Sequence, residues 1–191
     1  MVIQDNLAER LFYNAVHHSD HQAFGQLYTL IKPAMMDFAI ALVKERWVAD
    51  ELVQDTFVNF WKQRATITEE VLNAKLYFLL KVKAAGVNYL QSVRKQEVID
   101  MELLDTSHLQ LMPDPEQLFI NAEIGRIIQQ AVDGLPGLCK LIYTMVRVDG
   151  LKYKDIAFLL NMPAKTVESK MMQAVKSMGE AVKLSLGERI T

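Results

Sequence analysis

The sequence predicts an all-α protein made of two small helical domains. Glycine and proline are rare, with 8 and 5 copies among 191 residues, and alternating strand-like patterns are scarce. Hydrophobic residues make up 51% of the chain, which is enough for real cores. Most of them recur at the three- and four-residue spacings of helices that bury one face. We therefore expect a helical bundle over residues 1–95, a linker over 96–113, and a domain containing a helix-turn-helix over 114–191.

The N-terminal domain is predicted to hold a series of helices. Asp20 is a good N-cap for a helix that runs through Ile31 and breaks near Pro33, because proline cannot donate the N–H that a helix needs. Further helices are expected over residues 34–44, 48–63 and 71–95. Residues 66–70 indicate a loop before the last of these helices, with Thr68 as a candidate cap.

The periodicity fades over residues 96–112, which indicates the linker between the domains. Asp114, Pro115 and Glu116 then combine a cap, a proline at the first helical position and an acidic first turn. We expect this helix to run to about Val132. A turn at Gly134 and at Pro136–Gly137 separates it from a further helix over residues 138–148.

Residues 151–175 match a helix-turn-helix at nearly every position. Ile156, Ala157 and Leu160 share one face of the first helix, and residues 161–163 break the pattern at a proline. The second helix has a stripe expected to be buried, made of Val167, Met171, Ala174, Val175 and Met178. Its remaining face holds side chains that suit phosphates and base edges in a major groove: Lys165, Thr166, Glu168, Ser169, Lys170, Gln173 and Lys176. A hairpin that only packs would show the same apolar spacing, but the small Ala157 and the short turn favour DNA binding.

The helix over residues 48–63 has two distinct faces. One face should pack in the bundle, through Val48, Leu52, Val53, Thr56, Phe57, Phe60 and Trp61. The opposite face is acidic and polar, and holds Asp50, Glu51, Gln54, Asp55, Val58 and Asn59. Two interpretations stay open: a solvated helix face, or a docking surface for a basic partner helix on which Val58 adds an apolar contact.

Residues 75–95 mix aromatic and basic side chains in a way that suits single-stranded nucleic acid. Tyr77 and Phe78 are nevertheless expected in the core rather than as a stacking platform. The other aromatic, basic and polar side chains of this helix include Lys81, Lys83, Asn88, Tyr89 and Arg94.

Bulk properties narrow the classes of protein that fit. The formal net charge is −2 and the pI is about 6.1, so a protein of this charge that binds DNA should do so weakly alone and gain affinity from a partner already on the template. A single cysteine and the lack of a run of eighteen apolar residues or a secretory signal indicate a cytoplasmic protein. No nucleophile–base pair, phosphate loop or carboxylate dyad stands at a meaningful spacing, so we expect neither an enzyme nor a small-molecule substrate.

Neither the clustered histidines nor the single cysteine predicts a metal or cofactor site. His17, His18 and His21 lie close together, but their spacing is not a standard zinc pattern. Cys139 is expected to be a small buried residue rather than a redox sensor. We therefore expect no cofactor and no bound metal.

The order of these parts resembles an extracytoplasmic-function (ECF) sigma factor, one of the two-domain initiation subunits of bacterial RNA polymerase. The resemblance covers residues 20–95 and 115–182. The segments that carry it are HQAFGQLY (21–28), ADELVQDTFVNFW (49–61), NYL (88–90), LP (135–136) and GLKYKDIAFLLNMPAKTVES (150–169). FVNFW and TVES are most similar to sigma factors of the Bacteroidetes type.

The resemblance implies a role for each set of residues. Asp50, Glu51, Gln54, Asp55 and Val58 would dock the clamp helices of the polymerase largest subunit. Residues 63–74 would capture a flipped base of the −10 element, and Lys81, Lys83, Asn88 and Tyr89 would line the path of the opened strand. Lys165, Thr166, Glu168, Ser169, Lys170 and Gln173 would enter the major groove at the −35 element. The implied partners are core RNA polymerase, promoter DNA and, as in many relatives, an anti-sigma factor.

The sequence also departs from the family pattern. Ala84 and Ala85 stand where relatives commonly have an asparagine and a basic residue, and Gly86 in mid-helix costs about 1 kcal/mol relative to alanine. Met172 lies towards the predicted groove face, and Gln173 occupies a position that is often basic. Two alternatives therefore stay open: a helix-turn-helix regulator that binds operator DNA without polymerase, and a helical adaptor derived from a sigma factor that binds proteins only.

Overall fold

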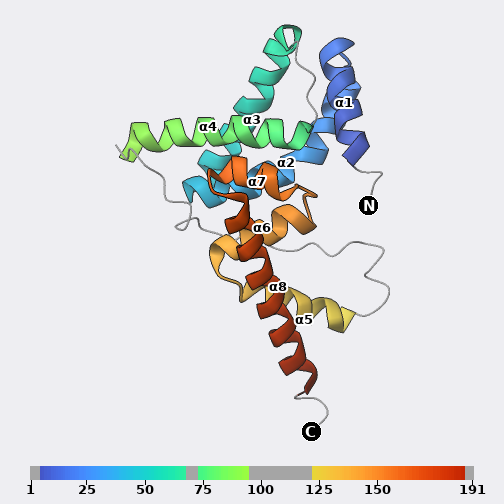
Figure 1. Cartoon of the computed structure of the whole chain (residues 1–191). Coiled ribbons are helices and arrows are strands. Elements are labelled where there is room, and N and C mark those ends of the chain that lie inside the picture. The colour runs from blue at the N-terminus through green and yellow to red at the C-terminus, as the bar shows by residue number, and fades with distance from the viewer. Residues whose placement is uncertain (1–4, 68–72, 95–121, 188–191) are drawn as a thin grey trace. The chain divides into compact units, whose positions relative to one another are not determined.

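The computed structural model describes residues 5–67, 73–94 and 122–187, and the regular elements in these ranges are all helical. The described residues form two compact units, one on each side of residue 100. Figure 1 shows each unit as a set of packed helices. The predicted all-α class is confirmed. The linker predicted over residues 96–113, the cap at Asp114 and the cap at Thr68 lie outside the described residues.

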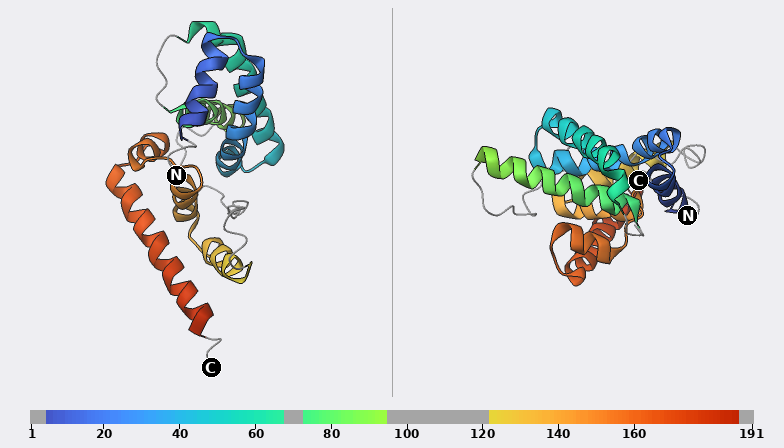
Figure 2. Two further views of the ribbon diagram at one scale, coloured as in Figure 1. Left: turned by 90° about the vertical axis from the view of Figure 1, so that its right-hand side faces the viewer. Right: turned by 90° about the horizontal axis from the view of Figure 1, so that it is seen from above.

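The N-terminal unit is built around one long central helix. Its elements are α1 (Asp5–His17), α2 (His21–Val43), α3 (Arg46–Gln63), a single 3₁₀ turn η1 (Arg64–Thr66) and α4 (Ala74–Arg94). Helix α2 packs against α1, α3 and α4, and Figure 2 shows it among them. The largest fully buried side chains of this unit come from three helices: Leu27, Ile31, Met35 and Phe38 from α2, Phe57 from α3, and Phe78 and Leu79 from α4.

Helix α2 continues through Pro33, so the predicted break near this residue was wrong. Proline removes one N–H bond from a helix and crowds the carbonyl one turn before it, here that of Thr29. Pro33 and Thr29 are both exposed, so the hydrogen bond that proline removes lies on the solvent side of α2. Eleven residues of α2 are buried, on both sides of the proline. Burial of this apolar face outweighs the loss of one hydrogen bond on the solvent side.

The predicted start of α2 is confirmed. The Oδ1 atom of Asp20 accepts hydrogen bonds from the N–H groups of Gln22 (2.8 Å) and Ala23 (3.0 Å), which otherwise have no partner at a helix N-terminus. At the other end, Lys44 adopts the left-handed conformation (φ 65°) and its N–H bonds the carbonyl of Ile40. This turn sends the chain directly into α3.

Helix α4 crosses α2 closely at Gly86. A Cβ atom at this position would lie 2.6 Å from Cδ2 of Leu42, a buried side chain. The helix cost that the sequence assigns to Gly86 is therefore offset by the close approach that glycine permits.

The C-terminal unit contains α5 (Ala122–Asp133), α6 (Gly137–Arg147), α7 (Tyr153–Leu160) and α8 (Ala164–Gly187). Helix α8 packs against each of the other three. The turn between α5 and α6 is fixed by an ion pair, in which Nζ of the buried Lys140 lies 2.8 Å from Oδ1 of Asp133. Hydrogen bonds from Lys140 and then Gln129 hold the pKa of Asp133 below its usual value.

Among the described helices, α2 is long and apolar enough to cross a membrane by length and composition alone. Its most apolar stretch is 61% buried inside the protein. The core helix of a packed bundle has the same length and composition.

Candidate nucleic-acid and partner surfaces

Helix α3 presents an acidic face to solvent. Glu51, Gln54, Asp55, Val58 and Asn59 are exposed and Asp50 is half-buried, whereas the opposite side buries Val48, Val53, Thr56, Phe57 and Phe60. The predicted division of this helix into two faces is therefore confirmed, with Leu52 and Trp61 half-buried between them. We refer to Asp50, Glu51, Gln54, Asp55 and Val58 as the α3 acidic face.

Asp50 is the member of this face that already has partners. Nζ of Lys32 lies 3.3 Å from Oδ1 of Asp50, and the amide of Gln54 donates a hydrogen bond to Oδ2. Hydrogen bonds with Tyr28 and then Asp50 raise the pKa of Lys32 and so favour its charged form. A partner that docks on the α3 acidic face therefore meets Glu51 and Asp55 beside an ion pair.

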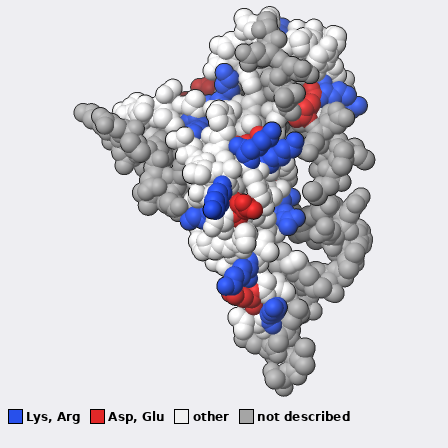
Figure 3. Space-filling model, viewed as in Figure 1, with Lys and Arg blue, Asp and Glu red and all other residues white. Residues whose placement is uncertain are grey.

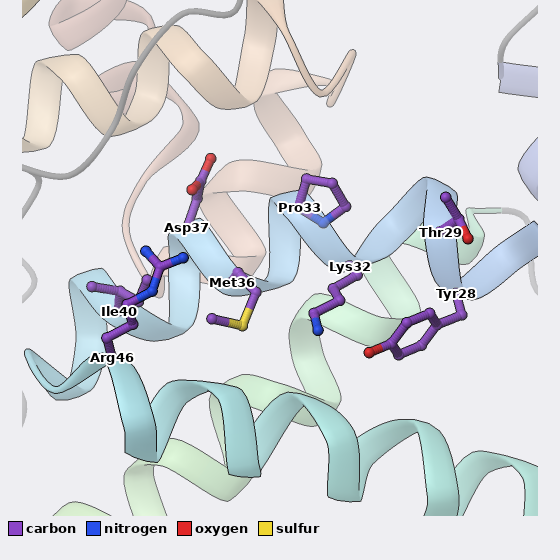
Figure 4. Close-up of a pocket in the computed structure, with 8 residues that line it drawn as sticks. All are labelled: Tyr28, Thr29, Lys32, Pro33, Met36, Asp37, Ile40 and Arg46. Carbon is purple, nitrogen blue, oxygen red and sulfur yellow. The ribbon is translucent and has the colours of Figure 1, made fainter.

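An open pocket of about 380 Å³ adjoins the α3 acidic face at Lys32. Figure 4 shows its lining side chains, which come from α2 and the first residue of α3: Tyr28, Thr29, Lys32, Pro33, Met36, Asp37, Ile40 and Arg46. Sequence reasoning missed this pocket because it needs α2 to continue through Pro33. With a break there, residues 28–32 and 36–40 would not lie on one surface.

The predicted strand-binding residues of α4 lie on different sides of this helix. Lys81 and Asn88 are exposed and seven residues apart, so they lie on the same side of the helix. Lys83 and Tyr89 are half-buried, and at about 100° per residue they lie on the two flanks of the buried stripe. Burial lowers the pKa of Lys83. The structure therefore brings Lys81 and Asn88 together and sets Lys83 and Tyr89 apart from them.

The aromatic residues at the start of α4 belong to the core. Phe78 is fully buried, and its ring centroid lies 4.6 Å from that of Phe57 and 4.9 Å from that of Phe60. Tyr77 is half-buried in the same cluster, where burial raises the pKa of its hydroxyl. The interpretation of both residues as core is confirmed. Nζ of Lys81 lies 5.4 Å from the Tyr77 ring centroid, close enough for a cation–π contact.

The C-terminal unit contains the predicted helix-turn-helix. Helix α7 buries Ile156, Ala157 and Leu160 and is capped by Asn161, which adopts the left-handed conformation (φ 54°) that asparagine tolerates. The N–H of Met162 then bonds the carbonyl of Ala157 at 3.0 Å, and α8 begins directly after Pro163. Three residues therefore turn the chain between the two helices.

Helix α8 presents most of the predicted DNA-contact residues on its outer surface. Lys165, Glu168, Ser169, Gln173 and Lys176 are exposed, and Thr166 and Lys170 are half-buried. Met172 is 66% exposed among them, as expected from the sequence. Oε1 of Gln173 also accepts a hydrogen bond from Sγ of Cys139 at 3.4 Å, which turns this side chain towards α6. The exposed residues form what we call the α8 polar face.

One residue of the predicted buried stripe on α8 was placed wrongly. Val167, Met171 and Ala174 are buried and Met178 is half-buried, but Val175 is 48% exposed. Ala174 lies at the centre of the stripe, and Val175 follows it by about 100° around the helix, at the edge of the contact.

The last candidate residues to be placed in the structure are Cys139 and the three histidines near the start of α2. Cys139 is buried, as predicted for a small core residue. The rings of His17 and His18 lie against Tyr13, and that of His21 lies against Trp61. Over residues 5–67, 73–94 and 122–187, the structure shows no group of three or more His, Cys, Asp or Glu side chains that could hold a metal ion.

Comparison with known proteins agrees with this geometry. The family model described as sigma-70, region 4, matches residues 125–178, which span most of α5 and continue into α8. Residues 125–178 of the C-terminal unit therefore match a sigma-70 region 4 domain. The helix-turn-helix prediction is thereby confirmed for this domain.

Two curated relatives extend the similarity over nearly the whole chain. The ECF RNA polymerase sigma-E factor of Escherichia coli (strain K12) is 20% identical over 186 residues, which cover 94% of this chain and 97% of the relative. That of Haemophilus influenzae is 24% identical over 177 residues, which cover 89% of this chain and 93% of the relative.

Two solved structures share the fold. One is the sigma factor RpoE in complex with the anti-sigma factor NepR from Bartonella quintana, with a TM-score of 0.50 and 18% identity over 85% of this chain and 98% of that chain. The other is CnrH in complex with the cytosolic domain of CnrY, with a TM-score of 0.50 and 16% identity over 93% of this chain and 98% of that chain. Together with the region 4 domain, the comparisons support an ECF sigma factor and do not favour an operator-binding regulator or an adaptor.

Proposed function

We propose that this protein is an alternative sigma factor of the ECF group, which binds core RNA polymerase in the cytoplasm and directs it to promoters. The observation that carries the proposal is the combination of a region 4 helix-turn-helix in one unit with an exposed acidic helix face in the other. In this proposal the protein acts by binding alone, and polymerase supplies the catalytic site. The Bacteroidetes-like type, suggested by residues 57–61 and 166–169, is part of the proposal.

The proposed polymerase contact is the α3 acidic face. Exposed carboxylates at the rim of an interface steer association with a basic partner, and the exposed Val58 adds apolar contact area. The partner would be the clamp helices of the polymerase largest subunit. Because Asp50 already pairs with Lys32, we assign the larger part of the attraction to Glu51 and Asp55.

The proposed DNA contacts lie in both units. Lys165, Thr166, Glu168, Ser169, Lys170 and Gln173 would contact the −35 element in the major groove, where lysines meet phosphates and polar side chains meet base edges. Residues 63–74 would capture a flipped base of the −10 element. Lys81 and Asn88 would contact the opened strand directly, with Lys83 and Tyr89 at the flanks of the same helix.

An anti-sigma factor is the third partner in this proposal. One structure that shares this fold, RpoE from Bartonella quintana, is a sigma factor in complex with the anti-sigma factor NepR. A binding partner that covers the α3 acidic face or the α8 polar face would keep the protein from polymerase or DNA.

The first experiment is co-elution of the purified protein with bacterial core RNA polymerase in gel filtration. The proposal expects a stoichiometric complex. Glu51→Lys combined with Asp55→Lys should weaken it by roughly tenfold, because both carboxylates are exposed and would then repel a basic partner. This pair leaves the Lys32–Asp50 ion pair in place, so a loss of affinity is not a loss of that contact.

A matched control comes from α8. Glu168→Lys combined with Glu180→Lys makes the same change of charge at two exposed positions of the other unit. This control should bind core polymerase as the wild type does. A folded wild-type protein that forms no complex would contradict the proposed function, and equal losses in the two double variants would contradict the assignment to α3.

A further inference from the structure

Helix α1 meets the end of α3 and the start of α4 through one buried aromatic ring. Phe12 is 5% exposed, and its ring centroid lies 5.2 Å from that of Phe60 on α3 and 5.2 Å from that of Tyr77 on α4. A third contact joins Phe12 to Phe78 at 6.2 Å. One side chain of α1 therefore packs against both α3 and α4.

Glu9, one turn before Phe12, caps the start of α4. Its Oε1 atom accepts a hydrogen bond from the N–H of Ala74 at 3.2 Å, while Oδ1 of Asn73 accepts one from the N–H of Leu76 at 2.8 Å. The other carboxylate oxygen, Oε2 of Glu9, is buried and has no hydrogen-bond partner within the described residues. A buried, unpaired oxygen costs free energy, which the partial positive charge at the start of α4 offsets in part. The cap formed by Glu9 therefore has a cost in free energy, because one of its two oxygens is buried without a partner among the described residues.

Arg64 ties the end of α3 to the turn between α1 and α2. Its Nε atom donates to Oγ of Ser19 at 3.0 Å, and its Nη1 donates to the carbonyl of Trp61 at 2.6 Å. The guanidinium also lies 4.1 Å from the Trp61 ring centroid. Ser19 has a φ of 51°, an uncommon conformation for serine, which places its hydroxyl in a tight turn. Arg64 therefore joins two elements that are 45 residues apart in sequence.

We propose that Glu9 and Arg64 are positioning residues: Glu9 fixes the start of α4 against α1, Arg64 fixes the end of α3 against the turn between α1 and α2, and together they set the strand-binding side of α4 relative to the α3 acidic face. Arg64 lies within residues 63–74, which the proposed function assigns to the flipped base, but its guanidinium is engaged by Ser19 and Trp61, so its role is to hold this segment in place. The inference rests on the proposed function, because it assigns polymerase to α3 and the opened DNA strand to α4. The link to DNA runs through Tyr77, which contacts Phe12 on one side and carries Lys81 over its ring. A shift of α4 against α1 would therefore move Lys81.

The test uses holoenzyme reconstituted from core polymerase and the full chain. Promoter opening is followed with a duplex that the wild-type holoenzyme selects from a randomised library, labelled with 2-aminopurine across its −10 region. Glu9→Ala should slow opening by roughly fivefold, the fold-change that corresponds to the loss of a helix cap. Arg64→Ala, which loses the hydrogen bonds to Ser19 and to the Trp61 carbonyl, should slow it by a similar factor. The affinity for core polymerase should stay within about twofold of the wild type, because the α3 acidic face is unchanged. Glu9→Gln keeps an oxygen for the N–H of Ala74 and should restore most of the rate.

Two control variants test whether slower promoter opening results from lost charge or lost stability and not from lost positioning. Lys62→Ala removes a neighbouring exposed positive charge that makes none of the contacts of Arg64, and it should open the promoter more than twice as fast as Arg64→Ala does. Ala39→Gly lowers stability within α2 by about as much as a lost cap does, and it should leave opening near the wild-type rate. Opening as slow in either control as in Arg64→Ala, or unchanged opening in both Glu9→Ala and Arg64→Ala, would overturn the inference. A wild-type holoenzyme that fails to assemble or to open DNA would overturn the proposed function itself, before any variant is compared.

Discussion

At the scale of single residues, two glycines inside helices have opposite surroundings. Gly86 faces Leu42 so closely that a Cβ would approach Cδ2 to 2.6 Å, whereas Gly25 has no atom within 4 Å of the place where its Cβ would stand. Helix propensity favours alanine at both positions by about 1 kcal/mol. Overpacking of a buried contact costs about 1–3 kcal/mol and applies only at Gly86.

We therefore expect Gly86→Ala to lower the stability of the N-terminal unit and Gly25→Ala to raise it by roughly 0.5–1 kcal/mol. Urea denaturation followed by tryptophan fluorescence measures this unit, because both tryptophans of the chain, Trp47 and Trp61, lie in it. Stabilisation by both substitutions would mean that Leu42 moves aside at little cost.

At the scale of helices, the sequence predicted which segments are helical better than where each helix ends. The apolar spacing of α3, α7 and α8 predicted most of their buried residues, because each of these helices keeps one face in solvent. The break at Pro33 was wrong for a reason that local sequence does not contain, namely that α1, α3 and α4 all pack against α2. Val175 was misplaced because the width of a buried stripe depends on the neighbouring helices, not on spacing alone.

The candidate surfaces were likewise predictable where all their residues lie on one helix, and not where they depend on contacts between distant segments. The α3 acidic face was predictable because all its members lie opposite one apolar stripe. The anchoring of α1 to α4 was not predictable, because Glu9 and Ala74 are 65 residues apart and carry no shared motif. The separation of Lys83 from Lys81 was already implied by helical geometry, since residues two apart lie on nearly opposite sides.

Helix α8 offers a test of the proposed −35 contact. Met172 is 66% exposed on the α8 polar face, between Ser169 and Lys176. Met172→Arg should raise the affinity of the holoenzyme for promoter DNA and steepen its salt dependence by about one unit of slope, because one more phosphate is neutralised. Filter binding over a range of salt concentrations measures both quantities.

The control lies on the same helix. Leu184 is 67% exposed, three turns beyond Met172, and outside the region 4 match. Leu184→Arg makes the same change of charge and should leave the salt slope of promoter binding unchanged. If both variants steepen the slope equally, the effect is a general attraction to DNA and the assignment of Met172 to the groove face is wrong.

At the scale of the whole molecule, charge decides how the protein can hold DNA. The net charge is −2, and over the described residues on the face in Figure 3 basic side chains are separated by uncharged and acidic ones. Counterion release therefore provides little affinity to the isolated chain. Polymerase, which grips DNA by itself, would provide this affinity in the proposed holoenzyme, and the sigma factor would add base-specific contacts in both units.

We accordingly expect the free protein to bind promoter DNA weakly, with a shallow dependence on salt. The complex with core polymerase should bind it roughly a thousandfold more tightly, the low end of the usual ratio of specific to non-specific binding. Fluorescence anisotropy of a labelled promoter duplex, titrated with and without core polymerase at several salt concentrations, measures this difference. Core polymerase alone on the same duplex gives the baseline. Tight binding by the free protein, unchanged by polymerase, would contradict the proposed function and indicate a regulator that recognises its operator alone. Such a regulator would obtain its whole affinity for DNA from its own side chains.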